Sequence, residues 1–276
     1  MTNSTSPAAE RRDARHGRNI TVIQEELFKP GRSKAERYAQ LVVGRPGIAA
    51  LARHEAIVTL CSALPGALGL LLRAKLYPLL LGRTGRNVTF GCNVVLRHPH
   101  KIRIGDDVVI DDGCCLDAKG EDNNGIDIGT GVFIGRGTIL SCKNGDIEIG
   151  AHANIGFNCE IFSGARVRLG RNTLLAAYTY LVGGDHCHDR TDVPVLHQER
   201  LARGIEVEDN AWLGAHVVVA DGVTIGRDAI IGAGAVVRRQ IPPFSVAAGV
   251  PARVIRDRRS HPPAHRDARP ASRVAD

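Results

Sequence analysis

The sequence predicts an all-β fold, a parallel β-helix, because three features recur with a period of six residues. An aliphatic residue occupies every sixth position in successive runs between Ile104 and Val237. A glycine usually follows it, as at Gly105 and Gly226, and the residue four places after it is small, as at Cys114. Fixed self-similarity at this period is typical of a β-solenoid, whereas helices repeat every 3.6 residues and strands every second residue.

Each hexad predicts one short strand and one corner, so that three hexads close a triangular coil. The aliphatic side chains point into the prism and stack on their equivalents in neighbouring coils, about 4.8 Å away. Grouping the hexads in threes gives six full coils. A partial coil around Phe90 and Leu96 precedes them. Glycine at the corners permits backbone geometry that a Cβ would obstruct.

Four breaks in the period indicate where loops leave the prism. The aliphatic spacing widens after Leu116, Leu140, Ile161 and Leu181, and each of these residues closes the third hexad of a coil. All four insertions therefore leave from the same corner. The longest, residues 183–204, contains three histidines and is the predicted catalytic loop, because irregular loops on a rigid scaffold commonly carry function.

The remaining segments frame this β-helix, which we place at residues 87–256. Residues 33–86 lack hexads and predict a helical segment that caps the open end of the prism, as terminal elements of solenoids do. Residues 1–32 and 257–276 are basic and low in complexity, which predicts disordered tails. The apolar run 64–82 contains charged residues and proline, which argues against a membrane-spanning helix. Peripheral contact of this run with a membrane is the alternative interpretation.

Charge and cysteine content exclude several classes of function. The formal charge is +7, but residues 1–40 contribute +3 and residues 253–276 contribute +4, which leaves the prism neutral. A neutral prism without a basic aromatic face argues against nucleic-acid binding. The seven cysteines have no paired CxxC spacing, so neither a disulfide framework nor a zinc ribbon is expected. The polar N-terminus lacks a secretory signal, and we expect a cytoplasmic protein.

The segment from Trp212 to Arg256, which ends in IPPFSVAAGVPARVIR, resembles the C-terminal half of hexapeptide-repeat acetyltransferases of the galactoside and maltose O-acetyltransferase type. Residues 128–196 are similar to members found in polysaccharide and lipopolysaccharide biosynthesis. The resemblance implies a left-handed β-helix and a homotrimer. It also implies acetyl-CoA bound between subunits and an acyl group transferred to a hydroxyl of a sugar, glycan or natural product.

The resemblance also implies a catalytic histidine. In the family it lies fourteen residues after the asparagine of an IGxN hexad, and here LGRN ends at Asn172, which selects His186. Histidine suits a base that removes a hydroxyl proton near neutral pH. Asp185 or Asp189 would orient its ring, and Asp189 is also a candidate acceptor contact. His188 is the rival base, because the motif DHCHD places two imidazoles close together.

The remaining site residues follow from the same resemblance. The position of a family asparagine that holds the acceptor falls on Gly156 here, which leaves Asn158 as the candidate acceptor contact. The only tryptophan corresponds to one near the donor thioester, small residues leave room for pantetheine, and arginines suit the phosphates of coenzyme A. The candidate donor residues are Trp212, Gly214, Ala215, Gly232, Ala233, Arg238, Arg253 and Arg256.

Two other functions fit the same scaffold. A metal-dependent enzyme resembling γ-class carbonic anhydrases would need three imidazoles around zinc, and His186, His188 and a third from a neighbouring subunit could supply them. A non-catalytic structural β-helix is the other alternative. For the acyltransferase we expect no metal. The sequence leaves open the acceptor, the length of the acyl chain and the choice between a hydroxyl and an amine.

Overall fold

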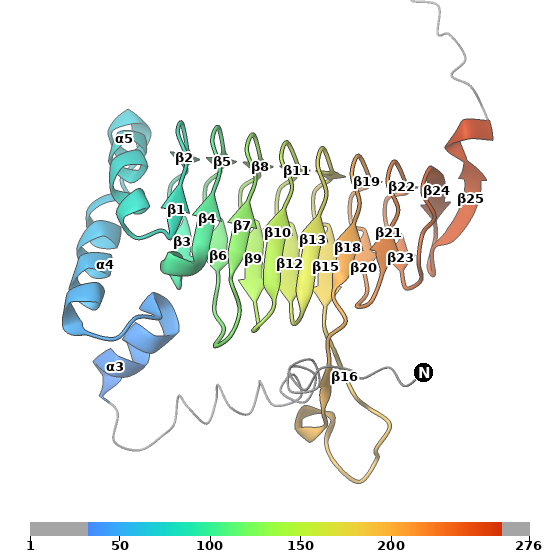
Figure 1. Ribbon diagram of the computed structural model, residues 1–276, viewed down its shortest axis with the longest axis horizontal. Coiled ribbons are helices and arrows are strands. Elements are labelled where there is room, and N and C mark those ends of the chain that lie inside the picture. The colour runs from blue at the N-terminus through green and yellow to red at the C-terminus, as the bar shows by residue number, and fades with distance from the viewer. Residues whose placement is uncertain (1–32, 261–276) are drawn as a thin grey trace, which may run out of the picture.

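The computed structural model describes residues 33–260, and most of them form a prism with three parallel sheets, here called A, B and C (Figure 1). Sheet A contains β1 (Arg83–Thr84), β4 (Ile102–Ile104), β7 (Ile126–Ile128), β10 (Asp146–Ile149), β13 (Arg166–Leu169), β18 (Ile205–Val207) and β21 (Thr224–Ile225). Sheet C contains β3 (Val95–Arg97), β6 (Cys115–Asp117), β9 (Ile139–Cys142), β12 (Glu160–Ser163), β15 (Tyr180–Gly183), β20 (Val218–Val219) and β23 (Val236–Val237). The predicted parallel β-helix is confirmed.

Sheet B is the longest, because it continues past the last full coil. Its strands are β2 (Thr89–Phe90), β5 (Val109–Ile110), β8 (Phe133–Ile134), β11 (Asn154–Ile155), β14 (Leu174–Leu175), β19 (Trp212–Leu213), β22 (Ile230–Ile231), β24 (Ser245–Ala248) and β25 (Arg253–Asp257). All pairs are parallel except β24 with β25. A 3-10 helix, Arg258–Ser260, follows β25. Residues 257–260, which were assigned to the C-terminal tail, are therefore part of this ordered end, and the tails predicted for residues 1–32 and 261–276 lie outside the described part of the chain.

The core is the column of aliphatic side chains that the period predicts. In sheet B, Ile110 pairs with Ile134, which pairs with Ile155, and all three side chains are fully buried. Stacking identical strands at about 4.8 Å places each side chain on its equivalent in the next coil. The small residues fill the same interior, where the hydroxyl of Thr138 donates to the carbonyl of Gly156. A buried hydroxyl with such a partner avoids the cost of an unsatisfied polar group.

One more complete coil is present than the sequence predicts. Strands β1, β2 and β3 form it, in the region assigned to the helical cap and to a partial coil, so the β-helix begins at Arg83 and not at residue 87. Seven coils are complete, and β24 opens an eighth. The sequence pattern does not predict this first coil because Thr84, which pairs with Ile104, stands where the pattern requires an aliphatic residue.

The loops leave as the spacing predicts. The extra residues lie between β6 and β7, β9 and β10, β12 and β13, and β15 and β18, always between a strand of sheet C and the next strand of sheet A. We call this corner the loop edge. The corner between sheets B and C is called the B–C corner.

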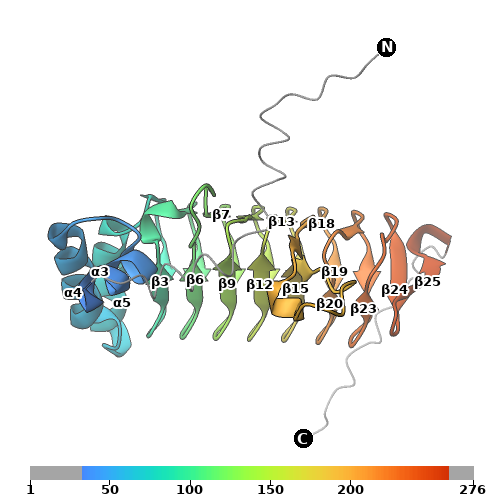
Figure 2. The same cartoon turned by 90° about the horizontal axis from the view of Figure 1, so that it is seen from below.

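Helices cover the first coil, as expected for a cap (Figures 1 and 2). They are α3 (Lys34–Tyr38), a π-helix (Ala39–Val43), α4 (Ile48–Cys61), α5 (Gly66–Leu76) and a 3-10 helix (Tyr77–Leu79). The buried Arg73 joins cap and coil, because its guanidinium donates to the carbonyls of Phe90, Cys61 and Leu64. No helix within residues 33–260 is both long and apolar enough to cross a membrane.

Candidate functional site

The predicted catalytic loop is a hairpin that projects from the loop edge, drawn in yellow-orange below the prism in Figure 1. Strand β16 (Asp185–His186) pairs antiparallel with β17 (Arg200–Leu201), with Asp185 opposite Leu201 and His186 opposite Arg200. A 3-10 helix, Val195–His197, lies between the two strands. This pairing fixes His186 at the base of the hairpin, close to the body of the prism.

The imidazole of His186 contacts an arginine. Arg200 donates to Nε2 of His186 from Nε at 3.2 Å and from Nη2 at 3.1 Å. Because Nε2 accepts, the neutral ring carries its proton on Nδ1. Nδ1 is buried and has no hydrogen-bond partner within the described residues. Burial lowers the pKa of Arg200, which is the cost of placing a guanidinium in a partly desolvated site.

The carboxylates expected to orient this ring lie elsewhere. Asp185 is exposed, and its Oδ1 accepts from the backbone nitrogen of His186 at 2.8 Å. Asp189 is exposed further along the hairpin. The rival base His188 is also exposed, and its Nδ1 donates to the carbonyl of His186 at 3.0 Å. The structure therefore brings Arg200, which the sequence did not single out, to the ring of His186. Residue-type patterns could not find it, because the pairing depends on hairpin register.

The candidate acceptor residue Asn158 lies at the B–C corner, on the opposite side of sheet C from the loop edge. It is exposed and has a φ of 51°, the left-handed conformation that asparagine tolerates at corners. Gly156, two residues before Asn158, stands where the family has an asparagine, and the packing between coils favours glycine there. A Cβ at Gly156 would lie 2.8 Å from the backbone nitrogen of Ala177 in the next coil. Within one subunit the structure does not bring Asn158 together with His186.

The candidate donor residues gather around the last coils of sheet B. Register pairs Trp212 with Ile230, Ile230 with Val246 and Val246 with Arg256, which forms one outward row across β19, β22, β24 and β25. Three strand spacings place Trp212 about 14 Å from Arg256. Trp212 is 46% exposed, so its ring is available to a ligand. Arg253 is also exposed and pairs with Ala248 in the same two strands.

The predicted small residues lie next to this row, whereas Arg238 does not. Gly214 and Ala215 occupy the B–C corner of one coil, and Gly232 and Ala233 occupy it in the next, where the nitrogen of Gly214 donates to the carbonyl of Ile231. Arg238 follows β23 and is exposed at the loop edge, across sheet C from these corners.

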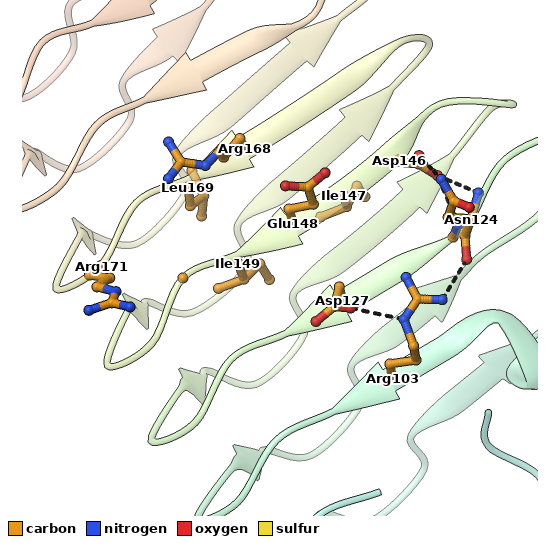
Figure 3. A pocket seen from close by; sticks show the side chains of 12 residues that line it. Arg103, Asn124, Asp127, Asp146, Ile147, Glu148, Ile149, Arg168, Leu169 and Arg171 are labelled. Carbon is orange, nitrogen blue, oxygen red and sulfur yellow. Dashed lines mark hydrogen bonds and ion pairs between the residues drawn. The ribbon is translucent and has the colours of Figure 1, made fainter. Parts of the chain in front are cut away.

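A shallow hollow lies on the outer face of sheet A, away from all these residues (Figure 3). Its charged groups compensate one another: Arg103 pairs with Asp127 at 2.9 Å, and the backbone nitrogen of Asn124 donates to Asp146 at 2.7 Å. A surface whose charges are already paired is a solvated face and not a candidate site. Within residues 33–260, no three His, Cys, Asp or Glu side chains converge as metal ligands would.

Residues 204–239 match the family model described as the bacterial transferase hexapeptide of six repeats. A probable acetyltransferase of Mycobacterium tuberculosis is 31% identical over 133 residues, which cover 48% of this chain and 44% of the relative. Galactoside O-acetyltransferase of Escherichia coli K12 is 40% identical over 117 residues, or 41% of this chain and 54% of the enzyme. The chain thus spans about half the length of these relatives.

Among solved structures, the N-acyltransferase AntD from Bacillus cereus, in complex with dTDP and 3-hydroxybutyryl-CoA, aligns with a TM-score of 0.48 and 20% identity. The alignment covers 64% of this chain and 84% of that chain. A likeness at this score has no bearing on function. Residues 204–239 thus carry hexapeptide repeats of the bacterial transferase type, and the chain is similar over 117 residues to galactoside O-acetyltransferase.

Proposed function

We propose that this protein is an acyl-CoA-dependent O-acyltransferase, with acetyl-CoA as donor and a hydroxyl of a sugar, glycan or natural product as acceptor. One observation carries the proposal. His186, selected by the family spacing, is held at the root of a hairpin that leaves the edge of a rigid prism, and its Nε2 accepts from the guanidinium of Arg200. The similarity to galactoside O-acetyltransferase supports the same chemistry.

In this mechanism Nε2 of His186 removes the proton from the acceptor hydroxyl. The oxygen attacks the carbonyl carbon of the thioester, the carbon–sulfur bond breaks, and the proton passes from His186 to the departing thiolate of coenzyme A. A positioned base of this kind contributes about 10²–10⁴-fold to the rate. Because Arg200 donates to Nε2 in the resting protein, the acceptor hydroxyl must take the place of Arg200 at that nitrogen.

The donor is proposed to lie along the outer row of sheet B. The exposed indole of Trp212 and the small residues Gly214 and Gly232 leave space for an extended pantetheine beside the backbone. Arg253 and Arg256, at the far end of this row, suit the phosphates of coenzyme A, because guanidinium groups bind phosphate through two donors at once. Asn158 remains the proposed acceptor contact, and it would reach the site from a neighbouring subunit.

We further propose a homotrimer in the cytoplasm, without a metal, in which each site lies between two subunits. One subunit supplies His186, and its neighbour supplies the B–C corner. The separation of Asn158 from His186 within one subunit supports this arrangement.

The test is the release of free thiol from acetyl-CoA by the purified protein, with a panel of hydroxyl acceptors whose products are identified by mass. Acceptor-dependent thiol release with a matching acetylated product supports the proposal. Absence of transfer to every acceptor, together with stoichiometric zinc and hydration of carbon dioxide, would favour the carbonic-anhydrase-like alternative. Absence of both activities and of bound zinc would favour a non-catalytic β-helix.

A further inference from the structure

A basic cluster lies along the loop edge beside His186. It consists of Arg97, Lys119, Lys143 and Arg200, with the carboxylate of Asp117 among them. Each of these residues ends a strand of sheet C, lies just after one or, for Arg200, belongs to the hairpin that follows β15. Residues far apart in the sequence are thereby stacked along one edge of the prism.

Only part of this charge is compensated. Asp117 is buried, with its side chain 6% exposed, and its Oδ2 pairs with Lys119 at 3.3 Å and with Arg97 at 3.6 Å. Within the described part of the chain, neither Lys143 nor Arg200 has a carboxylate within 4 Å. The cluster thus holds four cations and one anion.

The excess charge is partly desolvated. Burial lowers the pKa of the Lys143 ammonium, and the charges of Lys119 and Arg200 lower it further, while Asp117 raises it. Burial also lowers the pKa of Arg200. Cations crowded together without a counter-ion destabilise a fold, because desolvation and mutual repulsion both oppose their charged forms. A bound anion would relieve both effects.

The position of the cluster separates it from the proposed donor site. Lys143 follows the third coil and His186 follows the fifth, so the two residues are two coil spacings apart, about 10 Å along the axis. The intervening turn carries Gly164, which lies against Gly183 and Ala202 at the root of the hairpin. Trp212, Arg253 and Arg256 lie beyond His186 in the opposite direction along the prism.

Resting on the acyltransferase function proposed above, we propose that the acceptor is an anionic sugar or glycan, whose carboxylate or phosphate binds between Lys143 and Arg200 while its hydroxyl reaches His186. Such an acceptor presents its charged substituent to Lys143 and Arg200 and its reactive hydroxyl to His186. Both ligand chemistries offer oxygen acceptors to ammonium and guanidinium donors.

This placement gives Arg200 a second role. Its guanidinium donates to Nε2 of His186 in the resting protein. An anion bound beside Lys143 attracts the same guanidinium, and this competition frees the lone pair of His186 for the acceptor hydroxyl. Arg200 is therefore a positioning residue that couples recognition of the anion to exposure of the base.

The experiment measures binding to the full-length protein by calorimetry, with glucuronate, glucose 6-phosphate and glucose as probes. Because charge-assisted hydrogen bonds are stronger than neutral ones, the anionic probes should bind at least roughly tenfold more tightly than glucose. Lys143→Gln should remove most of this preference. Lys34→Gln changes an exposed lysine on α3 with no place in the cluster, and it should retain the preference. Glucuronate and glucose 6-phosphate together distinguish a carboxylate from a phosphate.

Three results would overturn the inference: equal binding of the three probes, equal behaviour of Lys143→Gln and Lys34→Gln, or displacement of the anionic probes by coenzyme A alone, which would assign the cluster to the donor.

Measurements of turnover distinguish a failure of this inference from a failure of the proposed function. Acetyl transfer to neutral sugars only would leave the acyltransferase intact and remove the anionic acceptor. Tight anion binding without any thiol release would remove the acyltransferase and leave the anion site.

A variant of the positioning residue gives an independent readout. Arg200→Gln should raise KM for an anionic acceptor, because one of its two cationic partners is lost. It should raise kcat with a neutral acceptor, because the lone pair of His186, which Arg200 otherwise occupies, is then free. A loss of kcat that is equal for both acceptors would indicate that Arg200 only supports the hairpin, and would contradict the coupling.

Discussion

The imidazole of His186 has one nitrogen in contact with a cation and one without a partner, and this asymmetry sets the tautomer of the resting protein. Nε2 accepts from Arg200, and Nδ1 is buried and unpaired among the described residues. In the serine-protease pattern a carboxylate holds the second nitrogen. Here Asp185 accepts from the backbone nitrogen of His186 instead, so the ring is oriented by the donor at Nε2.

Gly156 provides a test of the stacking between coils. Gly156→Asn should lower the free energy of unfolding by about 1–3 kcal/mol, the usual cost of forcing atoms into a packed site. The new Cβ would lie 2.8 Å from the nitrogen of Ala177, a backbone atom that cannot turn aside. Urea denaturation measures the effect.

The matched control is Gly232→Ala, one of the last glycines at the same corner. Its new Cβ would meet the Cβ of Ala248 at 3.0 Å, at the end of the prism where the strand can shift. Gly232→Ala should lower the free energy of unfolding by less than Gly156→Asn does. Equal losses would contradict the account of why asparagine is absent from position 156.

Individual residues also show which contacts could be predicted from the sequence and which could not. The aliphatic period predicted the inward residues because every coil repeats the same contacts. It failed at Thr84, where one polar residue concealed a complete coil. The family spacing, not the period, pointed to His186, and neither pointed to Arg200, because β16 and β17 are two residues long and their pairing follows no period. Contacts that repeat can be predicted from the pattern, whereas contacts made once depend on the folded hairpin.

At the scale of elements, β25 carries the candidate donor arginines as an antiparallel addition to sheet B. Arg253→Ala and Arg256→Ala should each raise KM for acetyl-CoA roughly 10- to 150-fold and leave kcat nearly unchanged, because phosphate contacts are shared by the ground and transition states. Steady-state kinetics with varied donor measures this.

Deletion of residues 261–276 removes further arginines that match no family position, and serves as the control. It should leave donor KM close to that of the intact chain. If the deletion weakens acetyl-CoA as much as Arg253→Ala does, the arginines act through bulk charge, and the phosphate assignment fails.

The junction between cap and first coil should be sensitive to acid. Burial, together with the charges of Arg45, His98 and Lys101, lowers the pKa of His100 to about 4. Burial also lowers the pKa of His98, whose Nε2 donates to the carbonyl of Gln40 in the cap at 2.9 Å. The folded state thus favours neutral rings. Their contribution to stability is complete above the unfolded pKa of about 6.5 and is lost as pH falls toward 4.

Thermal denaturation at pH 7.5 and at pH 4.5 tests this sign. The wild-type protein should lose more stability on acidification than His100→Leu, which cannot be protonated at this position. His197→Leu, at an exposed position in the hairpin, should follow the wild type. The same loss of stability in all three proteins would mean that acid acts elsewhere.

At the scale of the whole molecule, the three faces of the prism differ in character. The outward row of sheet A is charged and ion-paired, with Arg168 on Glu206 at 2.7 Å. The outward rows of sheets B and C are largely apolar. They include Leu174, Trp212 and Ile230 on sheet B, and Val95, Ile139, Tyr180 and Val218 on sheet C. Apolar patches of this kind mark interaction surfaces, so sheets B and C are the faces expected at the subunit contacts of the proposed trimer.

Light scattering tests this assignment. Val218→Glu places a charge on the apolar row of sheet C and should shift the protein from trimer to monomer, with loss of activity. Thr224→Glu places the same charge on sheet A and should leave a trimer. A fully active monomer, or dissociation of the sheet A variant alone, would be incompatible with a site shared between subunits.

The most direct test of the central claim is the steady-state rate of thiol release from acetyl-CoA in the wild-type protein, His186→Ala and His188→Ala, with donor binding measured alongside. The account predicts that His186→Ala lowers the rate about 10²–10⁴-fold while it still binds acetyl-CoA, and that His188→Ala remains active. Near-normal turnover by His186→Ala beside an inactive His188→Ala would contradict it.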